Sequence, residues 1–108
     1  MKHLTAKNFY QEVKQSPLPA VVMFYAVWCG KCAMMKPVVE DIEERYREKI
    51  NFFEVEIEES AVLAAEYEAD IVPTFAFFRD GALLCSRKGV MEESTFEGQL
   101  GAIFKTIN

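Results

Sequence analysis

Hydrophobic residues along the chain follow two different spacings, and the changes between them divide the sequence into strands and helices. Residues 20–26 form an uninterrupted apolar run, which is typical of a central strand covered on both faces. Residues 53–57 alternate apolar and acidic side chains, which indicates a strand at about 52–57. Residues 74–78 and 82–86 flank Asp80-Gly81, a pair that favours a two-residue turn between antiparallel strands. A short first strand is expected at residues 2–4.

Spacings of three and four residues predict helices between these strands. Thr5 is a suitable N-cap for a first helix in which Phe9, Tyr10 and Val13 share a face. A long helix is predicted from about residue 32 to 49, and a short one, capped by Ser60, up to residue 67. The final helix, from about residue 92, places on one stripe Phe96, Leu100, Ile103, Phe104 and Ile107. The order β-α-β-α-β-α-β-β-α predicts an α/β fold, a central mixed sheet flanked by helices on both faces.

Composition and charge restrict the class of protein. The 108 residues, 51% hydrophobic and 27% charged, fit a single domain over residues 1–108. A net charge of −5 argues against nucleic acid as a partner. The apolar runs are too short for a membrane span, and the polar N-terminus lacks the apolar core of a signal peptide, so a cytoplasmic location is expected. A monomer is expected because the pattern indicates no large exposed apolar patch.

The segment Trp28-Cys29-Gly30-Lys31-Cys32 carries the predicted chemistry, because it lies where the buried strand ends and the long helix begins. Two thiols three residues apart in the first turn of a helix can close a disulfide with little backbone movement. A helix N-terminus favours an anion, and Lys31 adds positive charge, so Cys29 is expected to be the thiolate nucleophile. Cys32, one turn inside the helix, is the expected resolving cysteine of a thiol–disulfide exchange.

Two other interpretations of the cysteine pair remain open at this point: inert buried thiols, or half of a zinc site. Zinc needs four ligands, and neither Cys85 nor His3 has the spacing of a ligand. We therefore expect no metal and no organic cofactor, with the dithiol itself as the redox centre. Cys85 is expected to be a small strand residue. His3 is not expected to act as a base, because it lies too close to the N-terminus.

The sequence resembles the thioredoxin family over nearly its whole length. The resemblance implies the thioredoxin fold and a protein thiol–disulfide oxidoreductase that reduces disulfides of target proteins. It also implies a reductase of the thioredoxin-reductase type as electron donor. In the family's order and spacing, the matching features are the motif at residues 28–32, Phe24-Tyr25-Ala26, Pro37, Val72-Pro73-Thr74, Gly81 and Gly89.

The resemblance also implies a surface on which target proteins dock. The proline that matches Pro73 is cis in the family and packs against the dithiol, which leaves neighbouring backbone groups free to bind a substrate strand. Gly30 lets a target chain approach closely, and Trp28 offers a flat apolar edge. Together the expected docking residues are Trp28, Gly30, Lys31, Val72, Pro73, Gly89 and Val90.

Three positions depart from the family's pattern. Met23 stands where the family has a buried aspartate that exchanges protons with the resolving thiol, and Glu54 stands where it has a neighbouring lysine. One hypothesis is that Glu54 takes over proton transfer, and the alternative is that it is a half-exposed strand carboxylate. Lys31 replaces the most common proline, which predicts a more oxidising couple than is usual. A dedicated reductant, an oxidant or isomerase, and a non-catalytic binding module therefore remain alternatives to a general reductant.

Overall fold

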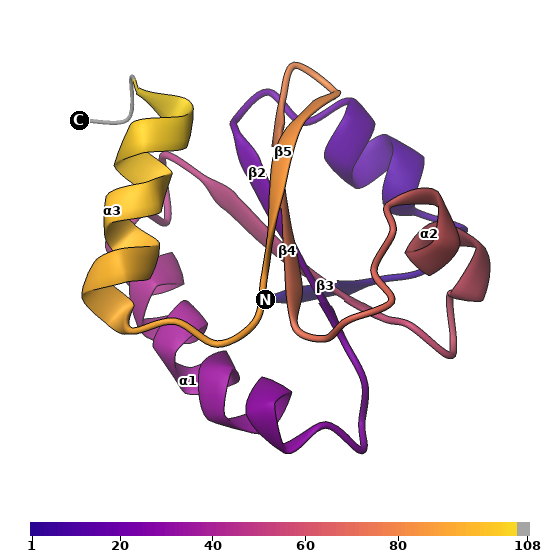
Figure 1. The fold of residues 1–108 in the computed structure, drawn as a ribbon. Helices are drawn as coiled ribbons and strands as arrows, with labels where there is room; N and C mark the ends of the chain where they lie inside the picture. Colours follow the sequence, from indigo (N-terminus) through magenta and orange to yellow (C-terminus); the bar gives the residue numbers. More distant parts are fainter. Residues whose placement is uncertain (106–108) are drawn as a thin grey trace.

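The computed structural model describes residues 1–105, and Figure 1 shows how its elements are arranged. Their order agrees with the predicted alternation of strands and helices. In chain order, the elements are β1 (Lys2–Leu4), η1 (Tyr10–Lys14), β2 (Ala20–Tyr25), α1 (Gly30–Arg45), β3 (Asn51–Glu56), α2 (Ala61–Glu66), β4 (Thr74–Arg79), β5 (Ala82–Lys88) and α3 (Glu93–Phe104).

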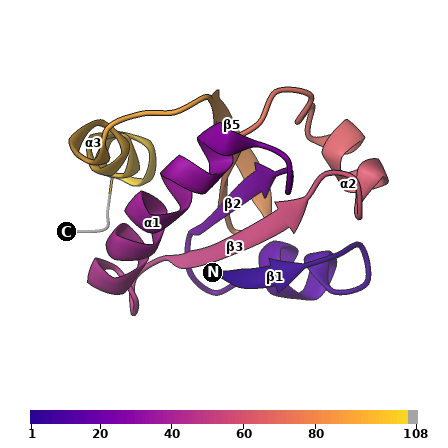
Figure 2. The ribbon, with the colours of Figure 1, turned by 90° about the horizontal axis from the view of Figure 1, so that it is seen from below.

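The strands form one mixed sheet in the order β1-β3-β2-β4-β5. The strands β1, β3 and β2 are parallel, whereas β4 runs antiparallel to β2 and β5 antiparallel to β4. Helices α1 and α3 lie on one face of the sheet, and η1 and α2 lie on the other (Figures 1 and 2). This arrangement confirms the predicted α/β class with helices on both faces.

Each face of the sheet buries its own apolar cluster. Under α1 and α3, Phe96 packs against Phe75 with a ring-centroid distance of 4.9 Å and lies close to Phe77 at 6.4 Å. On the opposite face, Phe9 from the segment before η1 packs against Phe78 at 6.0 Å. Because β2 lies between these two clusters, all but its last residue are buried, as the uninterrupted apolar run predicts.

The strand β3 forms at the predicted place, but its acidic residues are not on an exposed face. Glu54 and Glu56 are only 7% and 8% exposed. The interpretation of Glu54 as a half-exposed carboxylate is therefore wrong. Burial is possible because both side chains have partners: Glu56 accepts hydrogen bonds from the backbone N–H groups of Glu58 and Glu59, at 3.2 and 2.7 Å.

The predicted first helix is replaced by a turn and the π-helical segment η1. Thr5 begins the turn as expected, and its hydroxyl accepts a hydrogen bond from the N–H of Lys7 at 3.2 Å. Phe9 and Val13 are buried, but Tyr10 is 63% exposed, so its place on the buried face was predicted wrongly. The reason is that a π-helix has more residues per turn than the α-helical spacing assumes.

Two other helix boundaries differ from the prediction. Helix α1 begins at Gly30 and ends at Arg45, because Cys29 caps its first turn and the N–H of Tyr46 bonds back to Ile42 and Glu43. Ser60 precedes α2, but its side chain makes no capping bond, so the predicted cap is absent. In α3, Phe96, Leu100 and Phe104 form the buried stripe and Ile103 is partly buried, whereas Ile107 lies outside the described residues.

The predicted turn between β4 and β5 is confirmed at Asp80-Gly81. Both residues have a positive φ, 53° and 78°. Gly81 is required for a second reason, because a Cβ there would lie 2.5 Å from the carbonyl oxygen of Lys14. The hairpin brings β5 to the edge of the sheet.

Candidate functional site

Cys29 occupies the junction between β2 and α1 and is the N-cap of the helix. Its backbone is extended, with φ −91° and ψ 108°, and its sulfur accepts a hydrogen bond from the N–H of Cys32 at 3.1 Å. A first-turn N–H that would otherwise lack a partner is thus satisfied by sulfur. The residue is 9% exposed, so that a small part of it reaches the surface.

Cys32 lies one turn further along and is more deeply buried, at 3% exposure. Burial, and next the neighbouring sulfur of Cys29, raise the pKa of Cys32 to about 11. Both thiols are free. Both residues are buried, and Cys29 is the less buried of the two.

The loop before β4 lies beside the first thiol. The peptide bond between Val72 and Pro73 is cis, as the resemblance implies. The thiol of Cys29 donates a hydrogen bond to the Val72 carbonyl at 3.8 Å, and the N–H of Gly89 donates one to the Pro73 carbonyl at 2.8 Å. The antiparallel pairing of β2 with β4 brings this loop to the end of the sheet where α1 begins.

The expected docking residues differ in accessibility. Trp28 is 65% exposed, Gly30, Lys31 and Val90 are also exposed, and Val72 and Gly89 are half-buried. Pro73 itself is buried and cannot contribute surface. Exposed apolar residues near these positions in the chain, not included in the prediction, are Val27 and Ile71.

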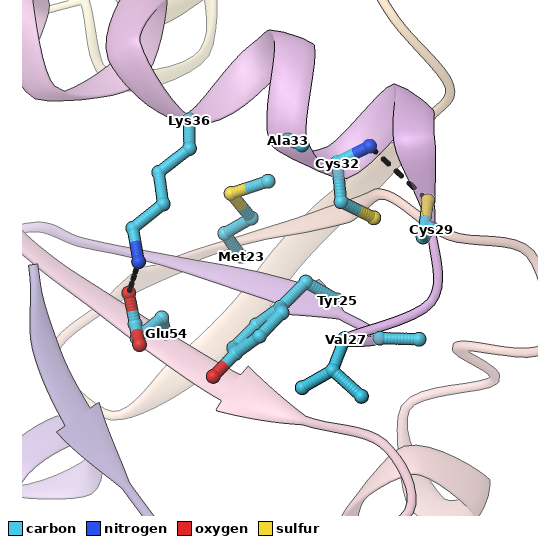
Figure 3. A pocket seen from close by; sticks show the side chains of 9 residues that line it. Met23, Tyr25, Val27, Cys29, Cys32, Ala33, Lys36 and Glu54 are labelled. Atoms are coloured by element: carbon cyan, nitrogen blue, oxygen red, sulfur yellow. Dashed lines mark hydrogen bonds and ion pairs between the residues drawn. The ribbon is translucent and has the colours of Figure 1, made fainter.

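A pocket of about 160 Å³ lies behind the dithiol, between α1 and the sheet (Figure 3). Cys29 and Cys32 line one end, and Lys36 and Glu54 line the other. Met23 forms part of the wall between them. The pocket therefore connects the sulfur atoms with an ion pair that the structure places at the far end.

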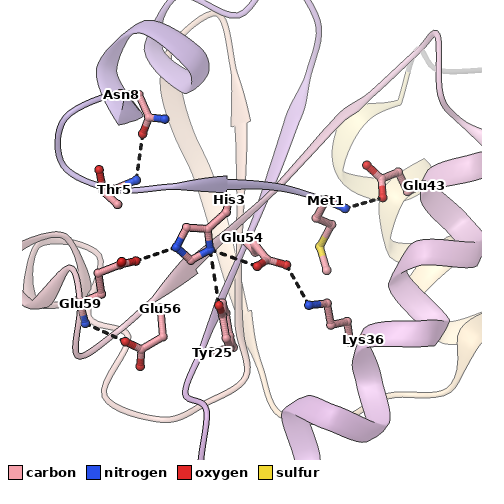
Figure 4. A network of polar contacts seen from close by, with 10 residues as sticks. All are labelled: Met1, His3, Thr5, Asn8, Tyr25, Lys36, Glu43, Glu54, Glu56 and Glu59. Atoms are coloured by element: carbon pink, nitrogen blue, oxygen red, sulfur yellow. Dashed lines mark hydrogen bonds and ion pairs between the residues drawn. The ribbon is translucent and has the colours of Figure 1, made fainter.

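The ion pair at the far end belongs to a larger polar network (Figure 4). One carboxylate oxygen of Glu54 lies 3.3 Å from the ammonium of Lys36, and the other lies 3.1 Å from Nδ1 of His3. Burial would raise the pKa of Glu54, but the hydrogen bond with His3 and the charge of Lys36 outweigh it and hold that pKa below its ordinary value. Glu54 is therefore an ionised, paired carboxylate.

Sequence reasoning missed Lys36, and it did not foresee the contact between His3 and Glu54. Lys36 follows Cys32 by four residues, so the helical spacing that puts both on one face was the available signal. His3 is brought in by the pairing of β1 with β3, in which His3 and Glu54 are register partners. No local pattern in the sequence reveals that pairing.

Other predicted features lie apart from this site. Cys85 is a half-buried residue of β5, paired with Phe77 on β4, which fits a small strand residue. Within residues 1–105, no three side chains of His, Cys, Asp or Glu are grouped so that they could hold a metal ion. Among the same residues, no helix combines the length and apolar character that a membrane crossing requires.

The geometry allows a defined type of chemistry. Two free thiols one helical turn apart, the first of them at a helix N-terminus, can exchange electrons with a disulfide. The capping bond holds the sulfur of Cys29 against the first turn of α1, and the three-residue spacing lets the two sulfur atoms pair with each other.

Comparison with known proteins agrees with this chemistry. Residues 1–102 match the Thioredoxin family. The chain is 35% identical to the thioredoxin of Porphyra purpurea, over 93% of this chain and 94% of that protein. It is 33% identical to thioredoxin 1 of Synechococcus elongatus, over 90% and 91% of the two chains. With the thioredoxin of Pyropia yezoensis it shares 34% identity over 93% and 94%.

Proposed function

Because the chain belongs to the thioredoxin family and is a thiol–disulfide oxidoreductase, we propose that Cys29 and Cys32 are the pair through which it reduces disulfides of target proteins. The observation that carries this proposal is the position of the Cys29 sulfur. It caps α1 at 3.1 Å from the Cys32 N–H and stands beside the Val72 carbonyl. The chain acts as one domain, with the dithiol as its redox centre and no organic cofactor.

The reaction proceeds in two exchanges. The thiolate of Cys29 attacks one sulfur of the target disulfide; a bond forms between the two sulfurs, and the other target sulfur leaves and takes up a proton. Cys32 then loses its proton and attacks the sulfur of Cys29. The Cys29–Cys32 disulfide forms, the bond to the target breaks, and the second target sulfur leaves as a thiolate, which takes up a proton. Two electrons pass from the chain to the target.

The target docks on the surface around Cys29. Exposed Trp28 and Val90 supply apolar contact, and exposed Gly30 presents no side chain to the incoming segment. The buried Pro73 follows the half-buried Val72 in the chain and accepts a hydrogen bond from the N–H of the half-buried Gly89, which positions both residues. The surface is small and local, which fits many target proteins better than one large dedicated partner.

The biological setting is a reducing compartment. A protein that delivers electrons from a dithiol must be re-reduced, so we propose a thioredoxin-reductase-type donor as the second partner. A cytoplasmic location follows from the same argument, because dithiols persist where glutathione and related systems keep thiols reduced. The protein acts as a monomer, since each exchange needs one copy of the dithiol. Neither nucleic acid nor a membrane is proposed as a partner.

The midpoint potential of the dithiol tests whether the protein is a reductant. Titration in thiol–disulfide buffers, followed by the fluorescence of Trp28, is expected to show one two-electron transition below the cytosolic glutathione poise of about −220 to −260 mV. Lys31 in place of proline is expected to move the value toward that poise. A midpoint clearly above the poise would instead make the protein an oxidant or isomerase, the second function that Lys31 favours.

We further propose that Glu54 exchanges protons with Cys32 through water in the pocket that both residues line. Cys32 has a raised pKa and must lose its proton during the second exchange, so that a nearby carboxylate accelerates this step. Lys36 and His3 keep Glu54 ionised, so that it can accept a proton, and their charges make it a weak base.

Replacing Glu54 by glutamine is expected to slow the second exchange by about tenfold. This is less than the usual rate contribution of a general base, about a hundredfold or more, because a carboxylate of low pKa is a weak base. A stopped-flow experiment with one equivalent of a chromogenic aromatic disulfide measures this step as the release of the second thiolate. Glu56→Gln is the matched control, since Glu56 is equally buried but does not line the pocket. An unchanged second phase in Glu54→Gln would remove Glu54 from the mechanism.

A further inference from the structure

Three residues that are register partners form a row across the sheet. The row runs from the pocket beside the dithiol to the edge of the sheet that β1 forms. Met23 on β2 pairs with Glu54 on β3, and Glu54 pairs with His3 on β1. We propose that His3 is a positioning residue that makes the second exchange pH-dependent: its protonated form holds Glu54 as a weak base between two cations, and its neutral form leaves Glu54 paired with Lys36 alone and a stronger base for the proton of Cys32. This inference rests on the function proposed above.

The contacts of His3 fix it between two carboxylates. Its Nδ1 lies 3.1 Å from Glu54, and its Nε2 lies 2.6 Å from Glu59, as Figure 4 shows. A ring with a carboxylate at each nitrogen donates at both positions only when it carries the positive charge. The contact is thus strongest in the imidazolium form.

The strand β1, which carries His3, is held in place by contacts with other elements. The terminal ammonium of Met1 lies 3.0 Å from Glu43 on α1, and the ammonium of Lys2 lies 2.8 Å from Glu12 on η1. Parallel pairing with β3 adds backbone hydrogen bonds on the inner side of β1. His3 is therefore a fixed member of the network and not a mobile terminal residue.

The groups that face His3 come from each neighbouring element. Glu54 comes from β3, Glu59 from the segment after β3, and the hydroxyl of Tyr25 on β2 lies 3.4 Å from Nδ1. Lys36 reaches Glu54 from α1. Burial, and next the charge of Glu54, raise the pKa of Tyr25 to about 12, so its hydroxyl stays neutral. Among these groups, an imidazole is the one that changes charge near neutral pH.

The direction of the effect follows from charge. Hydrogen bonds with Glu59 and then Glu54 raise the pKa of His3 above 6.5, against a smaller opposing effect of burial. Below that pKa the imidazolium stabilises the Glu54 carboxylate and makes it a poor proton acceptor. Above it the imidazole is neutral, so one of the two cations beside Glu54 is lost while Lys36 stays, and the carboxylate becomes a stronger base.

The pocket provides the route between Glu54 and the dithiol. Its volume of about 160 Å³ is large enough for several water molecules, since one water needs about 10–15 Å³ of such space. In the second exchange, the proton of Cys32 passes to this water and on to Glu54, the Cys32 sulfur bonds to Cys29, and the target thiolate leaves. The proton on Glu54 is then lost to solvent at the exposed edge, where His3 lies.

Two substitutions with opposite charge test the inference. His3→Gln removes the cation at every pH, and His3→Lys makes it permanent. In the stopped-flow assay described above, we expect the second phase of His3→Gln to be about threefold faster than that of the unaltered protein at about pH 6, because only part of a gain in basicity appears in the rate. At about pH 9 the two rates are expected to be equal. His3→Lys is expected to match the unaltered protein at about pH 6 and to be about threefold slower at about pH 9.

Controls separate this effect from a loss of structure and from a failure of the proposed function. Lys7→Gln removes an exposed lysine that is close to His3 in the chain but outside the polar network, and it is expected to leave both phases unchanged. In Glu54→Gln, the additional His3→Gln substitution is expected to have no effect. Equal pH profiles for His3→Gln and His3→Lys would overturn the role of His3. If the unaltered protein released no second equivalent of thiolate at any pH, the proposed exchange itself would be wrong.

Discussion

Replacing Cys29 by serine is expected to lower the rate of disulfide reduction by at least about a thousandfold, the range seen when a covalent nucleophile is removed. Serine preserves the size of the side chain and can still accept the N–H of Cys32 at the start of α1. The fold therefore remains, while the atom that attacks the target disulfide is lost. The measurement is the rate at which the protein, supplied with a dithiol donor, reduces a disulfide-bonded protein.

Cys85→Ser is the matched control for this result. Cys85 is the third free thiol, but it lies in β5, paired with Phe77 on β4, and is not part of the pocket beside the dithiol. The control is expected to retain the rate of the unaltered protein. Substantial activity in Cys29→Ser, or its loss in Cys85→Ser, would show that the chemistry belongs to another thiol.

Replacing Phe96 by alanine is expected to lower the free energy of unfolding by about 3–5 kcal/mol, the usual cost of deleting a large aromatic side chain from a core. Phe96 is fully buried and joins α3 to β4 through its edge-to-face contact with Phe75. The cavity would open between the helix and the sheet. Denaturant unfolding, followed by circular dichroism, measures the change.

An exposed apolar residue provides the comparison for Phe96. Val62 on α2 is 78% exposed, so Val62→Ala is expected to change the free energy of unfolding by less than about 0.5 kcal/mol. A similar small change in Phe96→Ala would mean that α3 contributes little to the stability of the sheet. It would contradict the packing described for that face.

Much of the fold was predictable because its signals are local. The apolar run of β2, the turn at Asp80-Gly81 and the stripe beginning at Phe96 each determine an element within a few residues. Tyr10 was misplaced because the period of a π-helix cannot be distinguished over so short a segment. The burial of Glu54 was missed because it depends on partners from other parts of the chain.

The site shows the same division. Cys29 and Cys32 are recognisable because their spacing and their place before a helix lie within one segment of sequence. Lys36 and His3 join the site only through tertiary structure, one by crossing from α1 to the sheet and the other by strand pairing. Chemistry carried by a motif was therefore predictable, whereas the polar network that surrounds it required the structure.

The most direct test of the central proposal is to trap the first intermediate in the variant Cys32→Ser. Without the second sulfur, the bond between Cys29 and the target cannot be broken by Cys32, so a covalent adduct should accumulate. Mass spectrometry of the digested adduct is expected to place the target on Cys29, in one copy, and to show release by added dithiol. An adduct on Cys85, or none at all under conditions in which the unaltered protein reduces the same target, would contradict the assignment of Cys29 as nucleophile and Cys32 as the resolving cysteine.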